Sequence, residues 1–570
     1  SSCFFWFRSR HGRKPCFGVP VVPKHSDMAL HMGRRVPTPF LCAQAQPREE
    51  VLEDVSGLKQ ELQKLQRCKQ PLRRRAGIEN VAPEVSPAKL PSPGWQLNLS
   101  SPNKENEETQ NTVAKRKLLE KEVSEEQMLV EALRNAPAGQ RFAALCNLRK
   151  ALAGLRPPIQ GVLRAGGAEV LVSTLRSTEG NAAAQTEAAW CLVQLASGST
   201  AQTKQLVQVS VCKAALEVLQ SSRMATSSEL CGFLLQLLAN VAGDVESSFR
   251  DGLLDADIVN ILGGLFAEMP NFTWTDLERC DVLRSFTWLM ATLCRGTPSP
   301  DLERVECAFD FFAQVLQGTT DTEMLSSAIW GLCYLLEGAP EDTERTERAL
   351  RMLSAGCEEE APAPHPLLQQ VVRCMRTPGD WRCPLPSAAL RLAGLLVQLP
   401  SARFADALLE AGLLGALHST LVDAYAPTQV RRDAAWTLAN LAAGTLSQAE
   451  RLAEQPGLVE ALCDQQLGPE VVVESSWTIL NLLQHGPQMF LRLGVHRVLS
   501  VLLHALQADA DSSLKCSAME QLELLMKELQ TPEVRGLAGK LQALSQSPDD
   551  AILNKARFLL QNFFPAESSM

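Results

Sequence analysis

Five helix-like segments of this chain repeat one pattern, a tryptophan among small apolar residues that is often followed by a polar residue four positions later. The segments are AAWCLVQLASG at Trp190, FTWLMATLCRG at Trp288, AIWGLCYLLEG at Trp330, AAWTLANLAAG at Trp436 and SSWTILNLLQHG at Trp477. Trp288 and Trp330 are 42 residues apart, and Trp436 and Trp477 are 41 apart. Repetition at this period is typical of helical units that stack on one another.

Two further segments continue the series without tryptophan. Gln236 in LQLLANVAGD and Arg391 in LRLAGLLVQL occupy the equivalent place, and the Pro-rich stretch 358–386 is interpreted as an insertion that lengthens one interval. The spacing falls within that of armadillo and HEAT units. We therefore predict an all-α, right-handed armadillo-repeat solenoid of about nine to ten repeats over residues 121–565, followed by a short tail at 566–570.

Composition agrees with packed helices. Aromatic residues make up 5% of the 570 residues, with only two tyrosines, while Ala and Leu are abundant. No apolar run is long enough for a membrane span, so no membrane partner is expected. The 17 cysteines include no CxxC pair and the eight histidines no HxxxH or HExxH pattern, so we expect reduced, buried thiols and neither a metal nor a cofactor.

Charge separates an arm from a body. Residues 1–120 contain 20 Lys and Arg against 12 Asp and Glu, a net of +8, so the whole-chain charge of −9 leaves −17 on residues 121–570. Prolines interrupt the arm, which we predict to be basic and largely disordered, with one short helix at about 49–67. The chain starts with Ser1, and Met28 is a candidate initiator, which leaves the status of residues 1–27 open. An acidic body suits basic peptides better than nucleic acid, although acidity can also serve solubility alone.

A repeated Trp with Asn at i+4 has a physical use in such a fold. Equivalent helix faces line up in a solenoid, and residues i and i+4 share a face. Asn can bond the backbone of an extended peptide, while Trp rings form troughs in which Lys stems lie flat under cation–π attraction. The alternative is that each Trp simply packs between repeats, but five in register favour a peptide-binding ladder.

Several multi-residue blocks, in order, resemble the importin-α family across residues 125–565. They are PPI at 157–159 followed by LRAGG, EAAWCLVQLASGSTAQT (187–203), ANVAGD (239–244), TWLMATLCRGTPSP (287–300), IWGLCYLLEG (329–338), AAWTLANLAAG (434–444) and KLQALSQSPDDAILNKARFLLQNFF (540–564). The resemblance implies a nuclear-import adaptor that binds the basic nuclear-localisation signals (NLS) of cargo proteins in a concave groove. It also implies importin-β and a recycling export receptor as partners, and a location in cytoplasm and nucleus.

The resemblance carries over the family's two peptide sites residue by residue. In the larger site, Gly198, Thr203 and Asp244 match the residues that hold a critical lysine, and Asn240 matches a ladder asparagine whose Trp partner is replaced by Gln236. Trp190 and Trp288 are kept, but their asparagines have become Gln194 and Thr292. The remaining positions assigned to NLS binding are Trp330, Glu337, Asp433, Trp436, Asn440, Glu474, Trp477 and Asn481.

The smaller site keeps the pairs Trp436/Asn440 and Trp477/Asn481, although Leu395 and Phe404 stand where the family has Asn and Thr. We therefore expect cargo binding that is weaker or altered and shifted towards this second site. Arg73, Arg74 and Arg75 are assigned to importin-β binding by the same resemblance.

Two other functional hypotheses are an armadillo scaffold, which stays open, and an enzyme, which the sequence does not support. An importin-α-like armadillo scaffold with no transport role would use the same surface for another protein ligand. An enzyme has no support, because the chain contains no G-x-S-x-G, P-loop, HExxH or Gly-rich dinucleotide turn.

Overall fold

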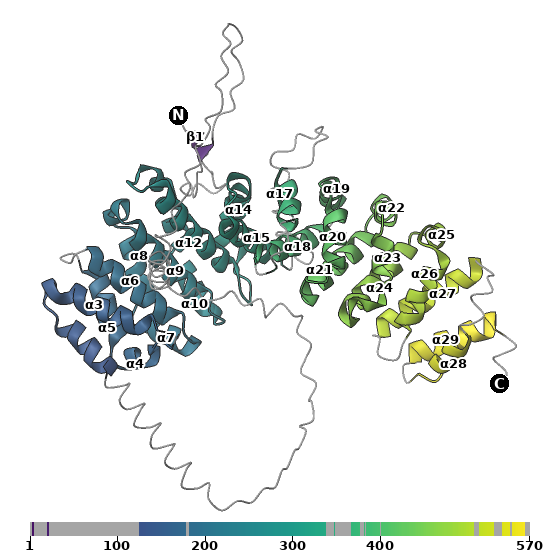
Figure 1. The fold of residues 1–570 in the computed structure, drawn as a ribbon, viewed down its shortest axis with the longest axis horizontal. Coiled ribbons are helices and arrows are strands. Elements are labelled where there is room, and N and C mark those ends of the chain that lie inside the picture. The colour runs from purple at the N-terminus through teal and green to yellow at the C-terminus, as the bar shows by residue number, and fades with distance from the viewer. Residues whose placement is uncertain are drawn as a thin grey trace, which may run out of the picture. The chain divides into compact units, whose positions relative to one another are not determined.

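The structure is a computed structural model. It describes residues 125–154, 156–177, 182–337, 347, 366–376, 381, 383–399, 401–506, 512–528, 538–547 and 550–564, and two short strands near the start of the chain. The strands β1 (Cys3–Phe4) and β2 (Pro20–Val21) pair antiparallel, with Cys3 opposite Val21. The other regular elements are helices, which confirms the all-α prediction (Figure 1). Arg73, Arg74, Arg75 and the segment predicted to form a short helix lie outside the described residues.

The chain divides into two compact units, Ser1–Cys307 and Ala308–Met570. In the first unit, residues 125–135 are helical. The elements that follow are α3 (Ala138–Leu152), α4 (Ile159–Arg164), α5 (Gly167–Arg176), α6 (Ala182–Ala196), α7 (Thr200–Gln208), α8 (Val211–Leu219), η2 (Ser222–Thr226), α9 (Ser228–Ala242), α10 (Ser247–Asp255), α11 (Ile258–Glu268), η3 (Met269–Asn271), α12 (Asp276–Cys294) and α13 (Leu302–Val305).

The second unit begins within α14. Its elements are α14 (Cys307–Gly318), α15 (Thr322–Leu336), α17 (Pro366–Met375), α18 (Leu385–Val397), α19 (Ala402–Glu410), α20 (Leu413–Val422), α21 (Thr428–Ala442), α22 (Leu446–Glu454), α23 (Leu458–Leu462), η4 (Gln465–Leu467), α24 (Pro469–Leu483), α25 (Gln488–Leu493), α26 (Val495–Ala505), α27 (Ser512–Glu528), α28 (Ala538–Leu544) and α29 (Asp550–Phe563).

Each unit is a stack of three-helix repeats. Two shorter helices precede a longer one in α4–α5–α6, α7–α8–α9 and α10–α11–α12, and again in α19–α20–α21, α22–α23–α24 and α25–α26–α27. In the second unit α19, α22 and α25 lie along one edge (Figure 1). The long third helices contact one another in sequence, α6 with α9 and α9 with α12 in the first unit, α18 with α21 and α21 with α24 in the second. We call these long third helices, together with α3 and α15, the inner helices.

The turn from the first to the second helix of a repeat has one recurring feature. It passes through one residue with positive φ, whether that residue is glycine or not: Gly166, Ser210, Asp257, Gly412, Gly457 and Gly494. A single left-handed residue reverses the chain in the space of one peptide, and Ser and Asp accept this conformation at a small cost. The repeats therefore share a backbone joint that the sequence does not mark with a constant residue type.

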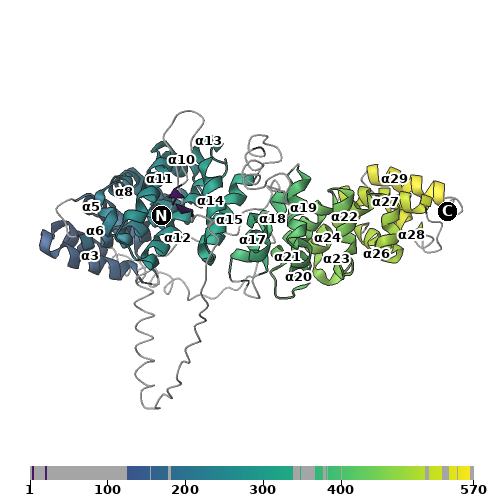
Figure 2. The same cartoon turned by 90° about the horizontal axis from the view of Figure 1, so that it is seen from above.

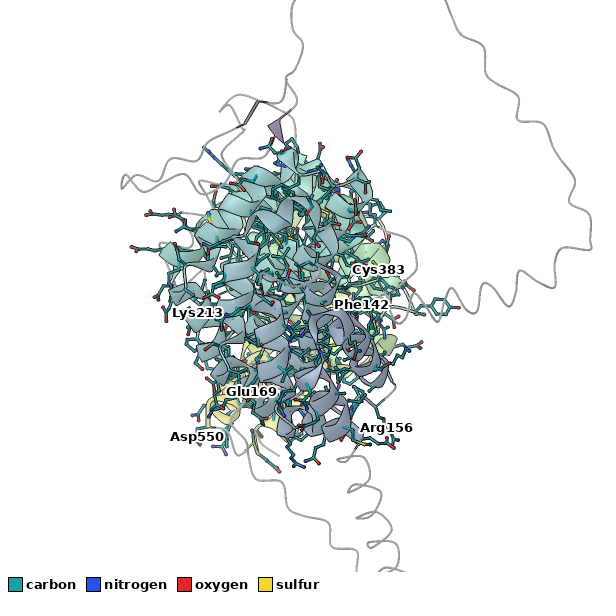
Figure 3. All side chains as sticks on the ribbon, turned by 90° about the vertical axis from the view of Figure 1, so that its left-hand side faces the viewer. Phe142, Arg156, Glu169, Lys213, Cys383 and Asp550 are labelled. Carbon is teal, nitrogen blue, oxygen red and sulfur yellow. The ribbon has the colours of Figure 1, made fainter. Side chains whose placement is uncertain are left out.

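Apolar and polar side chains separate as expected for a repeat stack. Leu and Ala fill the contacts between helices, while charged side chains such as Arg156 and Lys213 project outward (Figure 3). Helix starts follow capping rules. At α12 the Thr275 hydroxyl accepts from Glu278 N–H while the Glu278 carboxylate accepts from Thr275 N–H, and Thr445 and Gln448 do the same at α22.

Candidate peptide-binding site

The inner helices position every residue that the sequence assigns to peptide binding, except Gly198, Thr203, Asp244 and Glu337. Those four lie at or just beyond the carboxyl ends of α6, α9 and α15 or on α7. Consecutive inner helices contact one another within each unit (Figures 1 and 2). We call the assigned residues of the first unit the first row and those of the second unit the second row.

In the first unit, the first tryptophan of the row is covered by the chain itself. Trp190 is 1% exposed, and the guanidinium carbon of Arg149, from α3, lies 4.6 Å from the centroid of its ring. Arg149 also donates to Glu187 at 2.8 Å, so one arginine is held by a ring and a carboxylate of α6. Trp288, on α12, is 9% exposed. Both rings are mostly buried rather than open troughs.

The residues matched to lysine binding lie near one another but are not equally accessible. Asp244 accepts from the Thr200 hydroxyl at 2.8 Å, which brings the end of α9 against the start of α7, two residues beyond Gly198. Thr203, in contrast, is fully buried, and its hydroxyl donates to the Ser199 carbonyl at 3.3 Å. Asp244 and Gly198 are thus half-buried, whereas the Thr203 side chain lies in the interior.

Two of the three amides of this row bond to a neighbouring inner helix. Asn240 is fully buried, and its Nδ2 donates to the Val193 carbonyl of α6 at 3.3 Å. Gln236, in place of a Trp, donates to the Ser285 hydroxyl of α12 at 3.0 Å. Gln194 is 2% exposed, and its amide nitrogen is buried without a hydrogen-bond partner among the described residues.

The second unit holds a more open row. Trp436 and Trp477, on α21 and α24, are both partly exposed, as are Asn440 and Asn481. Asn481 Nδ2 donates to the Ala439 carbonyl at 2.9 Å, and Thr478 and His485 likewise contact α21 carbonyls at 3.3 and 2.8 Å. The Asn440 amide nitrogen is buried without a hydrogen-bond partner among the described residues. A donor in that state favours any ligand carbonyl that reaches it.

Two residues outside the predicted set hold Trp436 in place. Gly394 of α18 lies so close that a Cβ there would collide with the Trp436 ring. Arg391, one turn earlier, places its guanidinium carbon 5.1 Å from the ring centroid and its Nη2 3.4 Å from Glu337. Leu395 and Phe404, which replace polar residues of the resembled family, are both 6% exposed and belong to the core.

Carboxylates border the second row. Asp433 accepts from Gln429 at 2.9 Å, and Glu474 lies 3.8 Å from Arg432, which also lies 3.8 Å from Glu470. Burial raises the pKa of Asp433, and the nearby arginines offset part of that effect. Burial likewise raises the pKa of Glu474; Arg432 opposes the rise and the negative charge of Asp433 adds to it. A ligand cation would relieve both costs.

Trp330 completes the second row. Its ring stacks on Tyr334 of the same helix, with centroids 6.0 Å apart and an interplanar angle of 23°. The residues that sequence reasoning missed are Arg149, Thr200, Gly394 and Arg432, together with the stacking role of Arg391. A usable signal existed for three of them, because Arg149, Arg391 and Arg432 precede Trp190, Trp436 and Trp477 by 41 to 45 residues, about one repeat.

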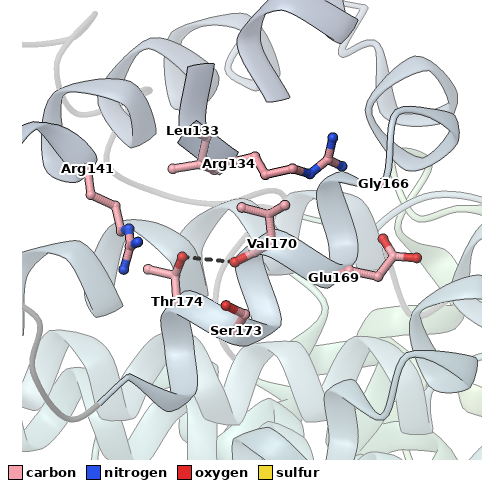
Figure 4. Close-up of a pocket in the computed structure, with 8 residues that line it drawn as sticks. All are labelled: Leu133, Arg134, Arg141, Gly166, Glu169, Val170, Ser173 and Thr174. Atoms are coloured by element: carbon pink, nitrogen blue, oxygen red, sulfur yellow. Dashed lines mark hydrogen bonds between the residues drawn. The ribbon is translucent and has the colours of Figure 1, made fainter. Parts of the chain in front are cut away.

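A separate pocket of about 360 Å³ lies at the first helices (Figure 4). It is lined by Leu133, Arg134, Arg141, Gly166, Glu169, Val170, Ser173 and Thr174, none of which was assigned to peptide binding. Among the described residues, no group of His, Cys, Asp and Glu could hold a metal ion, and no single helix is long and apolar enough to cross a membrane. The bent pair α19–α20 meets the length and composition criteria only when its two helices are taken together.

No protein-family model matches this chain. Importin subunit alpha-1b of Oryza sativa subsp. japonica is 29% identical over 211 residues, which are 37% of each chain, and importin subunit alpha-6 of Arabidopsis thaliana is 29% identical over 216 residues. Importin subunit alpha-1a of Oryza sativa subsp. japonica is 25% identical over 312 residues, 54% of this chain and 52% of that protein. The matches thus span between about a third and about a half of these relatives.

Among solved structures, an engineered protein from the Northeast Structural Genomics Consortium superposes with a TM-score of 0.61 at 23% identity, covering 77% of this chain and 98% of that one. This likeness supports the all-helical repeat fold. The sequence matches add a likeness to importin α subunits over part of the chain. The chain is thus similar in sequence to importin α subunits and shares an all-helical repeat fold with the engineered protein.

Proposed function

We propose that this protein is a nuclear-import adaptor that binds basic nuclear-localisation signals of cargo proteins on its inner helices and links them to importin-β. The observation that carries the proposal is the row in the second unit, where Trp436 and Trp477 are partly exposed beside Asp433 and Glu474. The likeness to importin α subunits supports the same ligand class.

The chemistry of the second row suits a lysine- or arginine-bearing extended peptide. Trp rings attract a cation and cover its apolar stem. Two carboxylates whose ionisation is opposed by burial gain from a cation placed between them. The Asn440 and Asn481 side chains are partly exposed and carry groups that can bond to a peptide backbone. These three contacts together recognise backbone and charge with little dependence on other side chains.

The first row supports a weaker contribution. Asp244 and Gly198 are half-buried, Asn240 and Thr203 are fully buried, and Trp190 is covered by Arg149. We accordingly assign the dominant peptide site to the second unit. Importin-β binding through Arg73 to Arg75, recycling by an export receptor, and residence in both cytoplasm and nucleus complete the proposal and follow from the family resemblance.

A direct test is fluorescence anisotropy with the full chain and a labelled lysine-rich localisation peptide. We expect micromolar or tighter binding that Trp436→Ala with Trp477→Ala reduces at least tenfold, and that Asp244→Lys reduces less. Leu446→Ala, at an exposed position of α22 outside both rows, is the control. Absence of binding to lysine-rich and bipartite peptides, with helical content intact, would refute the import proposal.

An armadillo scaffold with no transport role is the second candidate, because several amides of the ladder bond to preceding helices instead of facing a ligand. The examples are Asn240 to Val193 and Asn481 to Ala439. Importin-β capture separates the two candidates: a pull-down with the full chain that depends on Arg73, Arg74 and Arg75 supports the adaptor, and a folded chain that captures neither importin-β nor a basic cargo peptide supports the scaffold.

A further inference from the structure

Among the described residues, each unit holds an arginine that lies close to both a tryptophan ring and a glutamate, although the glutamate belongs to the tryptophan's own helix in the first unit and follows the helix before the arginine's in the second. Arg149 lies 4.6 Å from the Trp190 ring centroid and 2.8 Å from Glu187. Arg391 lies 5.1 Å from the Trp436 ring centroid and 3.4 Å from Glu337. In both cases the arginine belongs to the inner helix that precedes the tryptophan.

These arginines make the contacts that a basic ligand residue would make. A ligand lysine on a ladder tryptophan needs the ring face for its cation and a carboxylate for its charge. At Trp190 both are already used by Arg149, and the ring is 1% exposed. A second cation brought to either ring would meet the positive charge of the resident guanidinium at close range, where the partly buried setting strengthens repulsion.

Trp477 provides the contrast within the second unit. The arginine one repeat before it is Arg432, which lies 3.8 Å from both Glu470 and Glu474. Among the described residues, no cation is found over the Trp477 ring. Between α21 and α24, the Trp477 ring is therefore not covered by a cation from the described residues. Between α18 and α21, in contrast, Arg391 covers the Trp436 ring.

We propose that Arg149 and Arg391 act as resident cations that set the sequence preference of the peptide-binding surface. They exclude basic ligand residues from the surface next to Trp190 and from the surface between α18 and α21, where a neutral or acidic ligand residue is preferred. The basic residue of the ligand binds instead between Trp436 and Trp477. This inference deepens the proposed function and rests on it.

The carboxylate beneath Arg149 shows what removal of the arginine would create. Arg149 donates to Oε1 of Glu187. The other carboxylate oxygen, Oε2, is buried without a hydrogen-bond partner among the described residues. Loss of the guanidinium would leave a Trp ring and a buried carboxylate facing the vacated space. That pair is the site that a ligand lysine requires, and an unpaired buried carboxylate gains strongly from it.

The experiment is a positional scan with the full-length protein. A labelled peptide keeps one lysine fixed, and lysine, alanine or glutamate is placed in turn at each other position. Wild-type protein is compared with Arg391→Ala and Arg149→Ala. Arg403→Ala on α19 and Arg164→Ala on α4, both exposed, remove the same charge from each unit and serve as matched controls.

We expect each inner-helix variant to bind lysine at one additional peptide position about tenfold more tightly than wild type, the scale of one cation–π contact with its ion pair. Arg391→Lys, which keeps the charge, should retain the wild-type preference. Circular dichroism and thermal melting identify any variant that fails to fold, and Arg391→Gln then replaces Arg391→Ala.

The outcomes separate this inference from the proposed function. Wild-type binding with an unchanged positional preference in Arg391→Ala and Arg149→Ala, or equal shifts in the Arg403→Ala and Arg164→Ala controls, would overturn the resident-cation inference alone. Failure of folded wild-type protein and of all variants to bind any basic peptide would overturn the proposed function and this inference with it.

Discussion

At the residue scale, the position of the Trp436 ring depends on the lack of a side chain at Gly394. Gly394 of α18 allows the Trp436 ring to lie against the helix backbone, and a Cβ would also approach the Thr437 hydroxyl to 2.9 Å. Arg391 covers the ring from the same helix. One glycine and one arginine of α18 thus decide how a tryptophan of α21 is presented.

Gly394→Ala should therefore destabilise the second unit and weaken peptide binding there. Alanine favours helix, but overpacking against Trp436 should cost about 1–3 kcal/mol net. Denaturant unfolding followed by tryptophan fluorescence measures the first effect and peptide anisotropy the second. Gly415→Ala in α20 meets only Arg376 Nη2 at 3.9 Å and should be neutral or stabilising by up to about 1 kcal/mol; equal losses in both variants would contradict the packing argument.

The carboxyls Asp433 and Glu474 should make peptide binding pH-dependent. Their pKa values are raised, so they ionise at higher pH than exposed Asp and Glu. A cationic ligand binds the ionised forms, so affinity should rise with pH through the raised pKa values and then level off. Peptide titrations from about pH 4.5 to 7.5 measure this trend.

The raised pKa values of Asp433 and Glu474 affect folding stability in the opposite direction to peptide binding, because this contribution to stability falls as pH rises. A carboxyl whose pKa is higher in the folded than in the unfolded state contributes stability at low pH, and that contribution is lost as pH rises through the folded pKa.

Glu474→Gln should flatten the pH dependence of peptide binding and lower peptide affinity at neutral pH. Binding that strengthens on acidification would show that these carboxyls do not contact the ligand cation.

At the element scale, the carboxyl end of α12 is held by a buried arginine of α10. Arg250 is 1% exposed, donates from Nη1 to the Arg295 and Pro298 carbonyls at 2.8 and 2.9 Å, and pairs with Asp251 at 2.7 Å. The carbonyls that follow a helix end need such partners when the helix terminus is buried. Arg250 therefore joins the first helix of a repeat to the end of its inner helix.

Arg250→Met should destabilise the first unit by about 3 kcal/mol, because two carbonyls and a carboxylate lose their partner. Thermal melting followed by circular dichroism gives the shift. Arg304→Met removes an exposed pair, with Asp255 at 2.6 Å, and should cost less than about 1 kcal/mol. Similar melting shifts in the two variants would show that the Arg250 contacts carry no special weight.

At the scale of the whole molecule, stability should be local to the repeats. The inner helices contact their sequence neighbours within each unit, as in other repeat proteins, so a change in one repeat acts first on the adjacent ones. Arg250→Met should speed amide hydrogen exchange in α10 to α12 and leave α21 to α24 unchanged, and Gly394→Ala should do the reverse. Mass spectrometry of exchanged peptides reads both units at once, and uniform acceleration along the chain would contradict this local behaviour.

The sequence by itself determined the fold class and the period of the repeats. A pattern of apolar residues at helical spacing is a local property, and its recurrence after 42 residues from Trp288 to Trp330 and after 41 residues from Trp436 to Trp477 needs no knowledge of which helices touch. The Trp and Asn positions of the second row were found in the same way, because i and i+4 share a helix face in any α-helix.

Only the tertiary structure decided which of these side chains are exposed and which are buried. Asn240 and Asn481 look alike in sequence, yet one is fully buried and the other partly exposed, and both bond to a carbonyl of the preceding inner helix. Arg149 and Arg391 cover Trp190 and Trp436 from a neighbouring helix. The offset and rotation between packed helices set these contacts, and no local pattern along the chain encodes that relation.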